Sequence, residues 1–269
     1  MNKSSPPALL PFLREVCLPA LAARAPYFSL PHVRQFLTKH RVTATSAYVE
    51  GLTEEIFVER MLRQHLFHHG VKVERPLPAK KDFDPDGPRG GFTNWPAMEA
   101  DMNDWFAMNP DRPGSPARFT TLLDLYAMPA EVPGYQGRGA ALTAADVAAI
   151  ETAIAARLNE ARFHPYLQRH EFEALLLSHP PALARIFPQS AAGIANLEAA
   201  VAGIPPEEIN HGRRSHPAAR IYAAIPNYYA LKASNAYWVA GEIGLDTIRA
   251  KCPRFDAWLN GWEQWGMSP

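Results

Sequence analysis

Four acidic residues follow apolar runs in the sequence and could serve in phosphodiester chemistry. Glu50 comes directly after Val49, Asp124 closes the run FTTLLD, and Glu171 and Glu173 follow FHPYLQ. Phosphodiester cleavage needs a group that activates water and a cation that neutralises charge on the phosphate oxygens. Magnesium is usually held by one or two carboxylates with waters and substrate oxygens. The pattern therefore predicts Mg²⁺ or Mn²⁺ bound by Glu50, Asp124 and Glu171, with all four acids in a catalytic site.

The apolar runs before these acids are typical of buried strands, because they are β-branched or aromatic and do not alternate with polar residues. Strands are expected over 41–49, 71–75, 119–125 and 163–168, and helices over 53–70, 96–108 and from 143 onward. This alternation predicts an α/β fold with a mostly parallel sheet covered by helices on both faces. Ligands of such sheets bind at the carboxyl ends of the strands, where all four acids fall.

The two ends of the chain differ from this central pattern. Residues 1–42 predict a helical extension in two pieces, Leu9–Ala23 and His32–Lys39, separated by Pro26 and Pro31. Residues 43–269 are expected to form the α/β domain, whose portion from about residue 178 consists mostly of short helices.

The turn after the first strand has the residues of a phosphate-binding loop. Gly51 would allow close approach of a phosphate, and Thr53 is expected to cap a helix that begins at Glu54 and Glu55. Two acids at that position oppose direct anion binding, which favours a phosphate bridged by a metal. A turn followed by a helix cap explains the same residues without any ligand.

One basic cluster is dense enough to bind phosphate groups. It contains Arg213, Arg214 and Arg220, with His211 and His216 between them. We consider the three arginines candidate substrate-binding residues. The alternative is a solvated loop, or arginines paired with the nearby Glu207 and Glu208.

Composition limits the classes of function. Lys and Arg together number 27, as do Asp and Glu, so the overall charge does not favour nucleic-acid or membrane binding. The two cysteines, Cys17 and Cys252, predict neither a disulfide framework nor a zinc-thiolate site and suit the cytoplasm. No apolar run reaches the roughly 18 residues of a membrane helix. The sequence also lacks a G-x-x-x-x-G-K-[ST] motif, so any ATPase would be a separate chain.

Several segments resemble the bacterial family described as domain of unknown function 4276. They are YVEGLTE (48–54), TTLLDLYAMPAEVPG (120–134), PYLQRHEFEALL (165–176), EEINHGRRSHPAARI (207–221) and IGLDTIRAKCPRFDAWL (243–259). The resemblance covers roughly residues 43–262, and the HEFEALL block is its most specific part.

That family resembles the Toprim fold of topoisomerases, primases and nucleases that work beside phage-defence ATPases. The resemblance implies that Glu50 serves in acid/base chemistry and that Asp124 holds magnesium. Tyr126 departs from the pattern, because it stands where a second aspartate is expected, and Glu171 or Glu173 could supply the missing ligand.

Three hypotheses remain open at this point. The first is a Mg²⁺-dependent nuclease subunit that acts on DNA or RNA with a separate ATPase, as a monomer or an oligomer. The second is a non-catalytic adaptor that has lost the second aspartate. The third, a small-molecule phosphotransferase or hydrolase, has no substrate motif behind it.

Overall fold

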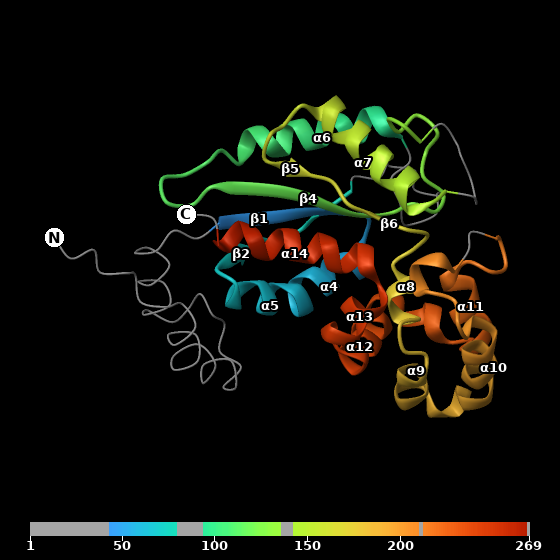
Figure 1. Cartoon of the computed structure of the whole chain (residues 1–269). Coiled ribbons are helices and arrows are strands. Elements are labelled where there is room, and N and C mark those ends of the chain that lie inside the picture. Colours follow the sequence, from blue (N-terminus) through green and yellow to red (C-terminus); the bar gives the residue numbers. More distant parts are fainter. Residues whose placement is uncertain (1–42, 80–93, 136–141, 210–211, 268–269) are drawn as a thin grey trace, which may run out of the picture.

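The computed structural model describes residues 43–79, 94–135, 142–209 and 212–267 (Figure 1). The helical extension predicted over residues 1–42 and the histidine at position 211 lie outside these ranges. No helix in the described ranges is both long enough and apolar enough to cross a membrane.

The centre of the molecule is a parallel sheet, which confirms the predicted α/β class. Its strands are β1 (Thr43–Val49), β2 (Val71–Val73), β3 (Leu77–Pro78), β4 (Ala117–Asp124), β5 (Phe163–His164) and β6 (Leu167–Gln168). The order is β2-β1-β4-β5, with β3 also paired to β1 and β6 also paired to β4, and each of these pairs is parallel.

Each edge of the sheet consists of two short strands, where the sequence predicted one strand. Pro76 lies between β2 and β3, and Pro165 lies between β5 and β6. Proline has no N–H group to donate to a neighbouring strand, so it interrupts the pairing. Only the central strands β1 and β4 run without interruption, and Val49 pairs with Leu122 at their shared carboxyl ends.

Helices cover both faces of the sheet (Figure 1). On one face lie α6 (Trp95–Met108) and α7 (Ala144–Leu158), and on the other lie α4 (Leu52–Phe57), α5 (Arg63–His68) and α14 (Pro253–Met267). Each face has its own buried apolar cluster: Phe119 and Leu123 point toward α6 and α7, whereas Val49 and Leu122 belong to the opposite cluster. The alternation of strand side chains between two faces produces this division.

The helical segment after β1 differs from the prediction in two ways. The cap is Gly51 rather than Thr53, because the Gly51 N–H group donates a hydrogen bond of 2.9 Å to the Glu54 carboxylate. In addition, a π-helical turn over Val58–Leu62 separates α4 from α5. Such turns often lie near functional sites.

Every described element after β6 is helical. The bounds are α8 (Glu173–Leu176), α9 (Pro181–Ile186), α10 (Ala191–Val201), α11 (Pro217–Ala224), α12 (Lys232–Ile243) and α13 (Leu245–Lys251), followed by α14. These helices lie beyond the carboxyl ends of β1, β4 and β6, and α14 returns along the sheet (Figure 1). The strand ends therefore meet the helical portion, and α8 and α12 contact each other and α4 contacts α12 at this junction.

Candidate functional site at the carboxyl ends of the strands

Glu50 and Asp124 lie side by side at the ends of the two central strands. The Asp124 backbone N–H group donates a hydrogen bond of 2.9 Å to the Glu50 Oε2 atom. The Glu50 N–H group in turn donates to the Leu122 carbonyl oxygen at 3.2 Å. Because β1 and β4 are neighbouring parallel strands, their carboxyl ends fall at the same edge of the sheet, as the sequence predicted.

The segment after β6 brings Glu171 to the same edge. The Phe172 N–H group donates a hydrogen bond of 2.8 Å to Asp124 Oδ1. The Glu171 Oε2 atom lies 2.7 Å from His216 Nδ1 and accepts a hydrogen bond of 2.9 Å from the Ala218 N–H group. Glu171 thus joins the strand ends to the N-terminus of α11.

Glu173 is completely buried, although its side chain carries a charge when ionised. Its Oε1 atom lies 3.1 Å from Lys232 Nζ, at the start of α12. Neither carboxylate oxygen of Glu173 accepts a hydrogen bond from the described residues. Buried carboxylates are normally paired and hydrogen-bonded, so a carboxylate with a single ion pair still has lone pairs available for a cation.

Glu54 is a further acidic residue of the site that was not among the predicted site residues. It is buried in the first turn of α4, where its Oε2 atom accepts the Gly51 N–H hydrogen bond. Burial raises the pKa of Glu54 to about 7; Lys232 opposes this rise and the charge of Glu173 adds to it. The charges of Lys232 and Glu173 therefore act on Glu54 as they act on the predicted site residues.

We call Glu50, Glu54, Asp124, Glu171 and Glu173 the carboxylate cluster. Burial, followed by the charge of Glu54, raises the pKa of Glu50 to about 8. Burial, followed by the charges of the other four cluster acids, raises the pKa of Asp124 well above its usual value. The pKa of Glu171 is also raised, first by burial and then by Glu173.

One lysine partly compensates the negative charge of the carboxylate cluster. Burial lowers the pKa of Lys232, but Glu173, Tyr222, Asp124 and Glu54 outweigh it and raise this pKa overall. Five carboxylates against one ammonium group leave an excess of negative charge. The cluster therefore suits an additional cation or stays partly protonated at neutral pH.

The donor atoms of the carboxylate cluster fit a hard divalent cation. All of its donors are carboxylate oxygens, the ligand type that Mg²⁺ and Mn²⁺ prefer. Glu50, Asp124 and Glu171 each accept protein hydrogen bonds at one oxygen, and these bonds orient the carboxylates. Among the described residues, three ligand atoms lie within 4.8 Å of one another at His65, His69 and Glu263, and not within the carboxylate cluster. Side-chain rotations must therefore accompany cation binding.

Tyr126, the residue expected to depart from the Toprim pattern, contacts the partner of Glu171. Its ring stacks on His216 with a centroid distance of 4.6 Å, and His216 binds Glu171. The neighbouring Ala127 and His170 have φ angles of 58° and 68°, in the left-handed region. Non-glycine residues seldom adopt this conformation, and such strain clusters at functional sites.

Gly51 and Thr53, whose phosphate contacts remain a prediction, lie at the start of α4. The Gly51 N–H group already donates to Glu54, and the Thr53 side chain is buried. The first turn of α4 therefore orients a carboxylate of the cluster.

Arg213 and Arg214 lie on the turn that leads to His216, and Arg220 lies within α11. Arg213 and Arg214 are exposed, whereas Arg220 donates a hydrogen bond of 2.6 Å to the Ser215 carbonyl oxygen. The alternative pairing with Glu207 and Glu208 is not found: Glu207 accepts from the Arg254 and Phe255 N–H groups, and Glu208 pairs with Arg169. Because His216 contacts Glu171, this turn borders the carboxylate cluster.

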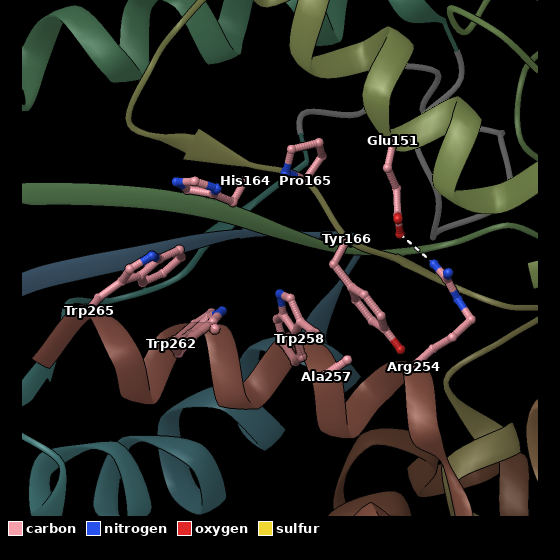
Figure 2. A pocket seen from close by; sticks show the side chains of 10 residues that line it. Glu151, His164, Pro165, Tyr166, Arg254, Ala257, Trp258, Trp262 and Trp265 are labelled. Atoms are coloured by element: carbon pink, nitrogen blue, oxygen red, sulfur yellow. Dashed lines mark hydrogen bonds and ion pairs between the residues drawn. The ribbon is translucent and has the colours of Figure 1, made fainter. Parts of the chain in front are cut away.

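A hollow of about 340 Å³ lies between α14 and strands β5 and β6 (Figure 2). Its wall is mainly aromatic, with Tyr166 stacked on Trp258 at a centroid distance of 4.6 Å. At one end Arg254 forms an ion pair of 2.6 Å with Glu151. The hollow shares no lining residue with the carboxylate cluster, so it is a separate feature of the surface.

The fold and the cluster together define a parallel α/β protein with an acidic site at the carboxyl ends of its strands. The chain belongs to the family described as Domain of unknown function (DUF4276), whose model matches residues 49–263. This range contains the whole carboxylate cluster and Lys232. No curated protein and no solved structure matches the chain.

Proposed function

We propose that this protein is a Toprim-like, Mg²⁺- or Mn²⁺-dependent phosphodiesterase that acts on nucleic acid. The carboxylate cluster carries the proposal, because it gathers five buried or half-buried acids and one lysine at the strand ends. Such an excess of negative charge is costly without a cation. A divalent cation at this position would polarise a phosphate oxygen and lower the pKa of a bound water.

Four of the five cluster acids, and Lys232, have a role in this proposal. Glu50, whose pKa is about 8, can exchange a proton with water or a leaving group near neutral pH. Asp124, Glu171 and Glu173 would hold the cation, and His216 and the Phe172 N–H group orient two of these carboxylates. Lys232 adds a positive charge beside the developing phosphate charge.

The substrate and the partners are inferred from the surroundings of the carboxylate cluster. Arg213 and Arg214 would contact the phosphate backbone at its border. Because the net charge of the chain is zero, a partner would supply the remaining positive surface. The Toprim resemblance suggests a separate ATPase, a cytoplasmic location and a role in defence against phages.

A cleavage assay on the full chain tests this proposal. Plasmid, single-stranded DNA and tRNA are each incubated with Mg²⁺ or Mn²⁺, with a chelator as the blank. We expect Glu50→Gln and Asp124→Asn to reduce cleavage by about 10²–10⁴-fold, the usual contribution of acid–base groups. Glu55→Gln is the matched control, since Glu55 is a neighbouring buried acid that pairs with Arg75 outside the cluster. Cleavage that survives both cluster substitutions refutes the assigned roles.

A second candidate function is a non-catalytic adaptor of the same complex. Two observations favour it: Tyr126 stands in place of the second aspartate, and the cluster acids do not close around a cation-sized space. Isothermal calorimetry separates the two functions. An adaptor of this type shows no saturable Mg²⁺ or Mn²⁺ binding, and the heat of titration is the same for the native chain and Asp124→Asn.

A further inference from the structure

We propose that His65, His69 and Glu263 form a second metal site, distinct from the carboxylate cluster and suited to Zn²⁺ or a similar transition-metal dication. The site would link α5 to α14 on one face of the sheet. It does not depend on the proposed nuclease function, because none of its residues belongs to the carboxylate cluster.

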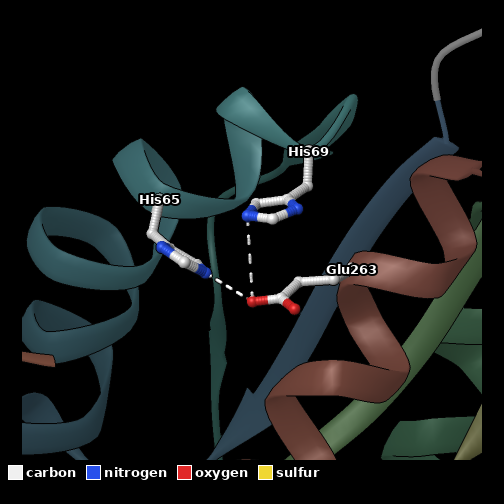
Figure 3. Close-up of side chains that lie close together, drawn as sticks. All are labelled: His65, His69 and Glu263. Atoms are coloured by element: carbon white, nitrogen blue, oxygen red, sulfur yellow. Dashed lines mark hydrogen bonds and ion pairs between the residues drawn. The ribbon is translucent and has the colours of Figure 1, made fainter. Parts of the chain in front are cut away.

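The three side chains converge from two helices (Figure 3). His65 lies in α5 and His69 directly follows it, so their four-residue spacing places both rings on one side of the helix. Glu263 reaches them from α14. One ligand atom from each residue lies within 4.8 Å of the other two.

The distances between the ligand atoms are close to those found around a bound zinc ion. His65 Nε2 lies 2.5 Å and His69 Nε2 lies 3.9 Å from Glu263 Oε1. Ligand atoms about 2.1 Å from a tetrahedral zinc ion are roughly 3.4 Å apart, which follows from the usual bond lengths. Movements of about 1 Å in the side chains would therefore bring all three ligand atoms to zinc distance.

The donor set favours zinc over magnesium. Imidazole nitrogens suit Zn²⁺, Cu²⁺ and Ni²⁺, whereas Mg²⁺ prefers oxygen ligands alone. Two histidines and one glutamate form a three-ligand zinc set that leaves a fourth position for water. The side chains of His65 and His69 are 25% and 37% exposed, so water can reach this position.

Arg249 contacts the proposed site, with its Nη1 atom 3.4 Å from His65 Nε2, and once a metal is bound it would move away from this nitrogen and serve as an outer-shell partner of Glu263. It donates a hydrogen bond of 2.5 Å to Glu263 Oε1 and another of 2.5 Å to Asp256. Ligating carboxylates are commonly held by such second hydrogen bonds. With neutral histidines, the two acids and one arginine sum to a charge of −1, so a dication is still attracted.

The packing of α14 holds the ligands in place. Gly266 lies three residues after Glu263, and a Cβ atom there would be 1.9 Å from the His69 carbonyl oxygen. The absence of a side chain at Gly266 thus permits the close approach of α14 to His69. The site is built from packed helices instead of mobile loops, which favours defined ligand geometry.

Titration of the chelator-stripped full chain with Zn²⁺ and with Co²⁺ tests this inference. We expect one saturable Zn²⁺ site that survives Asp124→Asn, and a strong visible absorption band for Co²⁺, as tetrahedral nitrogen-containing sites give. Removal of an outer-shell partner already weakens metal binding by roughly 10–100-fold, so His69→Ala should weaken it at least as much. Glu263→Gln provides a second ligand variant.

His68→Ala is the matched control, since His68 is in the same turn of the chain but not among the three ligands. Circular dichroism establishes that each variant is folded before titration. The inference is overturned if the native chain and His69→Ala bind Zn²⁺ equally, if neither binds it, or if His68→Ala loses as much affinity as His69→Ala.

Discussion

Replacement of Glu54 by glutamine should stabilise the metal-free protein. Glu54 is buried within the carboxylate cluster, and its ionised form is disfavoured there. Glutamine has nearly the same shape, and its amide oxygen can still accept the Gly51 N–H hydrogen bond that caps α4. The substitution therefore removes the charge while it retains the cap.

The pH dependence follows from the pKa of Glu54, which burial and then neighbouring acids raise from 4.5 to about 7. Between these values the folded protein retains a proton that the unfolded chain has lost. The contribution of Glu54 to the free energy of unfolding is therefore highest at or below about pH 4.5 and falls as pH rises toward 7. A rise of this size corresponds to about 3 kcal/mol at high pH. Because the neighbouring acids readjust, we expect Glu54→Gln to gain about 1–3 kcal/mol near pH 8.5 and less than about 1 kcal/mol near pH 5.

Denaturant unfolding with a chelator present, at both pH values, measures this difference. Glu55→Gln serves as the control, because Glu55 is buried but paired with Arg75 at 3.1 Å and should gain nothing at high pH. Added Mg²⁺ should stabilise the native chain more than Glu54→Gln. If Glu54→Gln is less stable than the native chain near pH 8.5, the buried, ionised Glu54 carboxylate does not destabilise the fold and the reasoning is refuted.

Three further results are expected. Lys232→Met should lower the free energy of unfolding, measured in a thermal melt, by about 2–4 kcal/mol. The loss should be smaller than for a wholly buried ion pair, because the Lys232 side chain is 32% exposed. Addition of Glu173→Gln should restore part of the lost stability. Mg²⁺ affinity, measured by calorimetry, should rise between about pH 6 and pH 8, because the raised pKa values require the cluster acids to lose protons before they bind. Gly193→Ala should cost about 1–3 kcal/mol, because its Cβ atom would lie 2.5 Å from the Ala224 carbonyl oxygen, whereas Gly241→Ala in open space should not destabilise.

The sequence was sufficient to predict the central layers of the fold. The predicted strands that end at Val49 and at Asp124 are the two central strands, and the helix expected over 96–108 is α6. These segments have strong apolar patterns, so their tertiary contacts agree with the secondary structure that the patterns predict. The edges were predicted less well, because the effect of Pro76 and Pro165 on pairing depends on which strands are neighbours.

The candidate site was predicted in part. The positions of Glu50 and Asp124 at strand ends followed from the parallel topology, and their hydrogen-bonded contact confirms that they are neighbours. Lys232 could not be found in this way, since it is more than a hundred residues from Asp124 and outside the segments that carry the family resemblance. Glu54 was not predicted as a site residue, because an acid in the first turn of a helix is common without any ligand.

The carboxylate cluster requires compensation of its negative charge whether or not it is catalytic. A buried acid such as Glu173, without hydrogen bonds from the described residues, costs stability unless a cation or a proton compensates it. Lys232 can compensate one carboxylate, and five are present. A proton can supply this compensation as well as a cation, so the absence of saturable cation binding would favour the adaptor. Where binding is found, cleavage shows whether the protein is an enzyme. Saturable Mg²⁺ binding without cleavage would assign the cation a structural role at the strand ends and leave Tyr126 as the reason for the missing activity.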